Sequence, residues 1–97
     1  MDLVIEYDSL AFNPKGTTTG IIYFNFNNFS FPDSEWNDFV EIILIWWLDS
    51  ICDFLENYSD SLEFEFMDGP FLVSVEHDKS DNLLKFNFYH DDDLMKS

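Results

Sequence analysis

The chain has 97 residues, which is enough for one domain and too few for two hydrophobic cores. Hydrophobic residues make up 46% of it and aromatic residues 20%, a composition that excludes an intrinsically disordered protein. Asp and Glu number 20 against 4 basic residues, all lysines, and the net charge of −16 argues against binding to nucleic acid or anionic membranes, which attract cations.

The N-terminal part of the chain is predicted to form two strands. Apolar residues alternate over 3–7, and a turn is expected at Asn13–Gly16, where a proline and a glycine occupy positions typical of a type I turn. Alternation resumes over 22–26, which predicts a second strand with one apolar face. The pattern shifts by one position at Asn27–Asn28, where we expect a bulge or a strand end that turns towards the next element.

A single long helix is predicted over 32–58, with Asp33 or Ser34 as its N-terminal cap. Its apolar residues recur at helical spacing, and we expect this stripe to cover one face of a small sheet. Trp46 lies at the edge of the stripe, where a core position is favoured over a position at the rim. The stripe comprises Trp36, Val40, Ile43, Trp47, Ile51, Phe54 and Tyr58, flanked by Phe39, Leu44 and Leu55.

The opposite side of this helix is acidic and also carries two isoleucines. Its residues are Glu35, Asp38, Ile42, Ile45, Asp49, Asp53 and Glu56. A solvated helix face needs no isoleucine, so the two within one turn of each other suggest a partner surface. Single exposed apolar side chains are also common on ordinary protein surfaces.

Three further strands are predicted over 62–66, 71–75 and 84–89, with a turn at Met67–Pro70. Each alternates apolar with polar residues, which is typical of an antiparallel sheet covered on one side. The segment 90–97 is expected to be a frayed acidic tail. The predicted fold is therefore a single α+β domain over 1–97: an antiparallel sheet of about five strands, covered on one face by a single long helix, in the order ββ-α-βββ.

Residue types suited to catalysis or metal binding are sparse. Cys52 is the only cysteine, so it has no disulfide partner within the chain, and nothing in the surrounding sequence marks it as a nucleophile. His77 and His90 are predicted to lie in acidic loops, with no catalytic partner beside them in the sequence. The run from His90 to Asp93 lacks the glycine and the spaced oxygens of a calcium loop. We expect no enzymatic activity, no cofactor and no metal.

The sequence shows neither a signal peptide nor a membrane span. Its first residues lack a basic segment followed by a long apolar one. The apolar run over 42–48 is far shorter than the roughly 20 residues that cross a bilayer. A cytoplasmic protein without membrane contact is expected.

Over roughly residues 22 to 76 the chain resembles the small immunity proteins of bacterial polymorphic-toxin and contact-dependent growth-inhibition systems. The resemblance rests on the strand leading into Phe31-Pro32, the segment Trp36-x-Asp38-Phe39, the pair Trp46-Trp47 and the segment Phe66–Pro70. It implies a cytosolic antidote that binds the catalytic domain of a toxin and blocks its active site or substrate path. Such toxins are often nucleases with basic clefts, which agrees with the acidity of this chain.

The expected partner is therefore the C-terminal domain of a cognate toxin, a basic protein, bound 1:1 by a chain that is monomeric when free. We expect no direct nucleic-acid contact. The residues predicted to bind the partner are Asp38, Ile42, Ile45, Asp49, Asp53, Glu56, Glu63 and Glu65.

Two other functions stay open from the sequence. The first is an acidic mimic of nucleic acid that inhibits a DNA- or RNA-binding protein. It would share the charge but space its carboxylates along an elongated surface. The second is a scaffolding domain that oligomerises through the apolar residues on the outer side of its helix.

Overall fold

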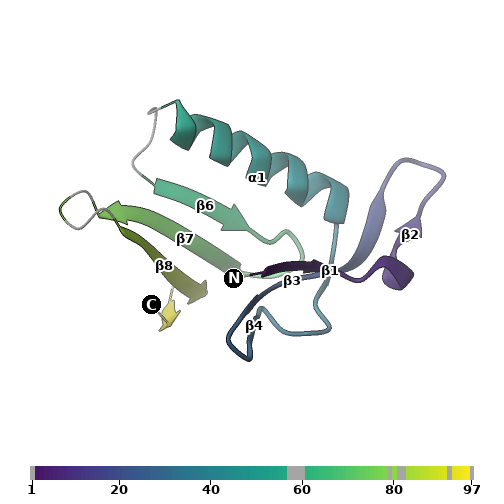
Figure 1. The fold of residues 1–97 in the computed structure, drawn as a ribbon. Helices are drawn as coiled ribbons and strands as arrows, with labels where there is room; N and C mark the ends of the chain where they lie inside the picture. The colour runs from purple at the N-terminus through teal and green to yellow at the C-terminus, as the bar shows by residue number, and fades with distance from the viewer. Residues whose placement is uncertain (1, 57–60, 79, 81–82, 92, 97) are drawn as a thin grey trace.

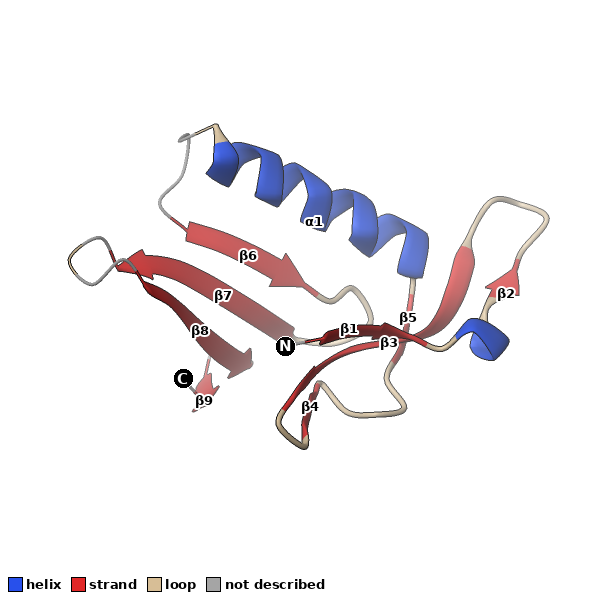
Figure 2. Ribbon diagram, viewed as in Figure 1, coloured by secondary structure: helices blue, strands red, loops and turns tan. Residues whose placement is uncertain are grey.

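The computed structural model describes residues 2–56, 61–78, 80, 83–91 and 93–96. In this part of the chain it has an α+β fold, with one α-helix and antiparallel strands (Figure 1). The predicted class and the single helix are confirmed. The strands, however, form two sheets instead of the one sheet that was expected (Figure 2).

The first sheet is organised around β3 (Thr18–Phe26), which pairs with every other strand of that sheet. Its other strands are β1 (Asp2–Ile5), β2 (Ala11–Phe12), β4 (Phe29–Phe31) and β5 (Asn37–Asp38), and a 3-10 turn, η1 (Tyr7–Ser9), separates β1 from β2. The second sheet has the spatial order β6-β7-β8-β9, formed by β6 (Ser61–Glu65), β7 (Phe71–Asp78), β8 (Leu83–His90) and β9 (Asp93–Lys96). The helix α1 (Val40–Leu55) connects the two sheets in sequence.

The alternation shifts at Asn27–Asn28 because these two residues form a hairpin loop. They form neither a bulge nor a strand end that turns towards the helix. Phe26 pairs with Phe29, and both asparagines have positive φ, 40° and 72°. Two-residue hairpin turns of type I′ require positive φ at both central positions, which asparagine tolerates better than most residues. The turn predicted at Asn13–Gly16 is confirmed, since the Gly16 N–H donates to the Asn13 carbonyl at 2.9 Å.

The helix begins at Val40, eight residues later than Pro32, the predicted first residue. Before it, Asn37–Asp38 pairs with Gly20–Ile21 as β5. The predicted caps Asp33 and Ser34 are both wrong, because the residue at the N-cap position is Phe39. The Asp33 carboxylate instead accepts the Glu35 N–H at 2.8 Å within a turn. The predicted C-terminal end of the helix, Asn57–Asp60, lies outside the described residues.

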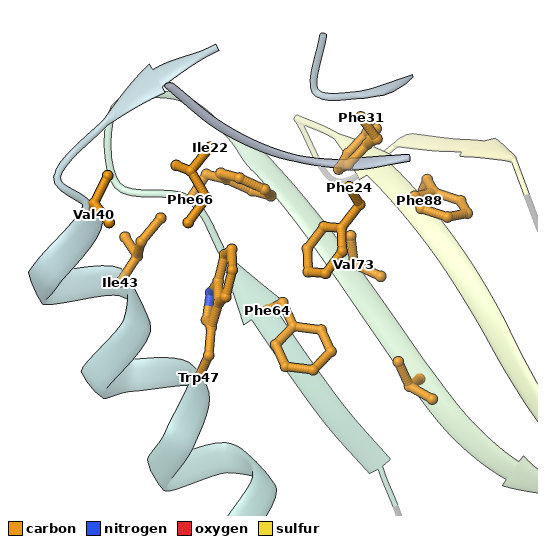
Figure 3. Packing of buried hydrophobic residues seen from close by; sticks show 11 residues of the cluster. Ile22, Phe24, Phe31, Val40, Ile43, Trp47, Phe64, Phe66, Val73 and Phe88 are labelled. Atoms are coloured by element: carbon orange, nitrogen blue, oxygen red, sulfur yellow. The ribbon is translucent and has the colours of Figure 1, made fainter. Parts of the chain in front are cut away.

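The hydrophobic core lies between the β3–β4 hairpin and the second sheet, with α1 closing one side (Figure 3). Phe24 of β3 stacks on Trp47 of α1 at a ring distance of 5.2 Å and lies 5.5 Å from Phe64 of β6. Phe31 of β4 meets Phe88 of β8 edge-on at 5.1 Å. The alternation in the last three strands correctly predicts the buried residues Phe64, Phe66, Val73, Val75 and Phe88. It is wrong for Leu84, which the same alternation places on the apolar face but which is 53% exposed.

The helix runs along the outer edge of β6, while the β3–β4 hairpin packs on the sheet face that the helix was expected to cover. The Trp47 indole N–H donates to the Glu65 carbonyl at 2.8 Å, and the Glu63 backbone N–H donates to the Ser50 hydroxyl at 3.1 Å. Unpaired edge groups of a strand otherwise invite pairing with another chain. α1 therefore satisfies and covers this edge.

The C-terminal segment is not a frayed tail in the described residues, because β9 pairs with β8 around a register shift at Phe88/Tyr89. His90, expected in a loop, ends β8, and its ring stacks on Phe71 at 4.6 Å with an interplanar angle of 8°. His77, also expected in a loop, lies in β7. Asp92 of the predicted acidic run lies outside the described residues.

Candidate functional site

A groove of about 420 Å³ lies between α1 and the exposed side of β6. Helical periodicity places the α1 residues on one side of the helix, and strand alternation points Ser61 and Glu63 to the same face of β6. We call this the acidic groove. It is lined by Trp46, Asp49, Ser50, Asp53, Ser61 and Glu63.

The acidic groove combines three carboxylates, two hydroxyls and one indole. Trp46 is 41% exposed, so its ring is accessible. Ser50 accepts the Glu63 N–H, which joins the two walls. Carboxylates form charge-assisted hydrogen bonds with lysine and arginine, and the face of an indole attracts the same cations. This set of side chains is therefore suited to a cationic group.

Three of the residues predicted to bind a partner, Asp49, Asp53 and Glu63, meet in the acidic groove. The other exposed ones do not line it. Glu56 follows the last residue of α1, and Glu65 borders a separate hollow of about 220 Å³ beside the β6–β7 turn. Ile42 is half-buried, and Ile45 is 54% exposed.

Asp38 was predicted on the exposed side of the helix, and this is wrong. It lies in β5 and is only 1% exposed. One carboxylate oxygen accepts the Phe39 N–H at 2.7 Å; the other accepts the Trp36 indole N–H at 2.9 Å and the backbone N–H groups of Met67 and Asp68 at 3.1 and 3.2 Å. With its acceptors occupied by the protein itself, Asp38 is unavailable to a partner.

Sequence reasoning missed part of the groove and misplaced two helix residues. Trp46 was favoured as a core residue, yet it lines the groove at the rim. Its spacing of three and seven residues from Asp49 and Asp53 was the available signal. Leu55 was expected beside the buried stripe but is 71% exposed. The reason is that α1 packs on a sheet edge, which covers a narrower stripe of the helix than a sheet face would.

A third hollow, of about 550 Å³, lies between the β3–β4 and β7–β8 hairpins. Its walls are mainly apolar and include Phe26, Phe29, Leu83, Leu84, Phe86 and Phe88. None of the residues predicted to bind a partner lines this hollow. Its walls are mainly apolar, so the negative charge of the chain gives no reason to choose it as the binding site.

Comparisons with protein-family models, with curated proteins and with solved structures find no match for this chain. Among the described residues, no helix is both long enough and apolar enough to cross a bilayer. Within the same residues, no three His, Cys, Asp or Glu side chains are grouped in a way that would hold a metal ion.

Proposed function

We propose that this chain is an immunity protein, which binds a cognate basic toxin domain of the nuclease type and neutralises it by blocking the active site or the substrate path. The observation that carries this proposal is the acidic groove, where Asp49, Asp53 and Glu63 meet beside the exposed Trp46. A nuclease cleft is built to hold phosphates with cationic side chains. Carboxylates presented together can occupy the same cationic positions.

The charge of the whole chain supports the same partner. A net charge of −16 attracts a basic protein over a long range, and such steering raises association rates towards about 10⁸–10⁹ M⁻¹s⁻¹ at low salt. Specific binding also needs a desolvated anchor, and tryptophan is among the residues enriched at the energetic centres of interfaces. Trp46 supplies such an anchor among the carboxylates.

One observation favours the second candidate, an acidic mimic of nucleic acid. The molecule measures 48 × 30 × 23 Å along its principal axes and is therefore elongated. A mimic would spread its carboxylates along the long axis to follow a phosphate backbone. The acidic groove instead gathers three of them in one hollow beside Trp46, which suits a protruding cationic group of a partner better than it suits an imitation of a phosphate backbone.

Both candidates are tested by capture from a lysate of the source organism, with the wild-type chain and a groove variant as baits. The groove variant is Asp49→Lys with Asp53→Lys, and the control with equal charge is Asp2→Lys with Asp8→Lys, two exposed positions outside the groove. We expect one basic protein with nuclease activity, which the wild-type chain inhibits at a 1:1 ratio. The groove variant should bind it about 100-fold or more weakly, and the control variant should change affinity little.

Two other results of this capture experiment would contradict the proposed immunity function. Capture of a DNA- or RNA-binding protein without catalytic activity favours the mimic. Capture of many basic proteins, released together at high salt and bound equally by both variants, contradicts both candidates, because the chain would then act only as a polyanion.

A further inference from the structure

A second face of α1 carries apolar side chains that no described element covers. Ile45, Leu48, Cys52 and Leu55 follow one another at intervals of three and four residues, so they lie along one face of the helix. Ile45, Leu48 and Leu55 are 54%, 60% and 71% exposed, and Cys52 is exposed as well. We call these four residues the exposed seam.

The exposed seam is separate from the other two faces of the helix. The core face is formed by Val40, Ile43 and Trp47, which pack against β3 and β6 (Figure 3). The acidic groove takes the side of α1 that faces β6. Scattered exposed apolar residues are ordinary, but apolar residues repeated at alternating steps of three and four form the contact seam of paired helices.

The charged residues of α1 that border the exposed seam are all negative. Asp49 and Glu56 follow Ile45 and Cys52 by four residues, and so border it on one side. Glu41 lies at its N-terminal end, where it accepts the Thr18 hydroxyl at 3.3 Å. α1 contains no lysine, arginine or histidine.

This charge pattern distinguishes between two possible partners of the exposed seam, a second copy of the chain and a basic helix. A second copy of the chain would bring carboxylates against carboxylates, with a net charge of −16 on each copy. A helix with lysine or arginine beside its apolar stripe would instead bury the leucines and pair with Asp49 and Glu56.

We propose that the exposed seam docks an amphipathic helix of another protein, one whose apolar stripe is flanked by lysine or arginine. This inference goes beyond the proposed function: it depends on the exposed seam, which shares only its bordering Asp49 with the acidic groove, and it holds whether or not the partner is a toxin.

Cys52 makes the test specific to this face, because it is the only cysteine and lies within the exposed seam. The probe is a cysteine-free synthetic peptide of about five helical turns, with leucines at helical spacing and lysines on both flanks. At saturation it should slow alkylation of Cys52 about tenfold or more, as expected for a thiol that docking shields from solvent. A peptide with the same leucines but glutamates in place of the lysines should leave the alkylation rate unchanged.

Variants of the protein then identify the groups that bind the peptide. Leu48→Gln with Leu55→Gln should weaken binding about 100-fold, since each buried leucine contributes about tenfold or more. The matched control is Leu94→Gln with Met95→Gln, two exposed apolar residues of β9, which should bind like the wild type. Glu63→Lys in the acidic groove should change binding little, so failure of this proposal is distinguishable from failure of the proposed function. Circular dichroism verifies that each variant is folded.

Three results would overturn the proposal. The first is an unchanged alkylation rate of Cys52 with the basic peptide at saturation. The second is equal binding of the peptide by the Leu48/Leu55 and Leu94/Met95 variants. The third is a chain that dimerises alone with Cys52 protected, because the occupant would then be a second copy.

Discussion

The buried carboxylate of Asp38 accepts the backbone N–H of Met67, 29 residues further along the chain, at 3.1 Å. The same oxygen accepts the indole N–H of Trp36. The Trp36 ring in turn packs so closely on Gly69 that an added Cβ there would lie 2.6 Å from it. The segments 36–39 and 66–70 therefore form one structural unit that joins β5 to the β6–β7 turn.

Replacing Asp38 with asparagine should destabilise the fold strongly. The amide keeps one acceptor oxygen but turns an NH₂ group towards backbone N–H donors that the carboxylate now satisfies. We expect Asp38→Asn to lower the free energy of unfolding by about 2–4 kcal/mol, measured by urea titration. The control Asp33→Asn, in an exposed turn where the amide oxygen can still accept, should change it by about 0.5 kcal/mol or less. Equal effects of the two variants would contradict a structural role for the buried carboxylate.

The adjacent tryptophans should lose stability to different degrees on the same substitution. Trp47→Phe keeps a ring in the core but loses the hydrogen bond to the Glu65 carbonyl, and should cost about 1–2 kcal/mol of stability. Trp46→Phe changes a ring at the rim of the acidic groove and should cost about 0.5 kcal/mol or less. Thermal unfolding followed by circular dichroism checks both. A larger loss for Trp46→Phe would mean that Trp46 is a core residue after all.

The loop between β3 and β4 offers a stabilising change. Asn28 has a φ of 72°, a conformation that glycine adopts without strain, and Asn-Gly is the preferred pair in type I′ turns. Asn28→Gly should therefore raise the free energy of unfolding by about 0.5–1 kcal/mol, whereas Asn28→Val should lower it by about 1–3 kcal/mol. Urea titration of both variants measures the difference. A loss with glycine that matches the loss with valine would show that the asparagine side chain itself, and not φ, matters at this position.

The strands after the helix could be predicted because their signal is local. Phe64, Val73 and Phe88 lie on the apolar side of a two-residue alternation, and each is buried as that alternation requires. The helix start could not be predicted in this way. Trp36 and Val40 are four residues apart, which suits a helix, but the pairing of Asn37–Asp38 with β3 decides the outcome through contacts distant in sequence.

The candidate site was likewise predictable only where its residues are related by a local sequence pattern. Asp49 and Asp53 are one helical turn apart, so sequence alone places them on one side of the helix. Glu63 joins them only because α1 packs along the edge of β6, an arrangement that no local pattern encodes. Asp38 was misplaced because carboxylates are seldom buried, and its burial depends on donors at Met67 and Asp68.

We expect the aspartates of the acidic groove to lower the stability of the fold. Asp49 and Asp53 stand four residues apart with the same charge, a spacing that destabilises a helix, and they lie in its C-terminal half, where the helix dipole favours cations. Asp53→Lys replaces the repulsion with an attraction and should raise the free energy of unfolding by about 0.5–1 kcal/mol at low salt. The gain should shrink at high salt, because exposed charges are screened.

The matched control for this prediction is Asp2→Lys, which makes the same change of charge in β1, away from the helix. It should raise the stability less than Asp53→Lys does, because only the relief of the overall negative charge contributes. Urea titrations at low and high salt measure both variants. A stability gain at Asp53 combined with the loss of partner binding expected of the groove variant would indicate that these acids are kept for binding. A stability loss at Asp53 would instead indicate that they support the fold.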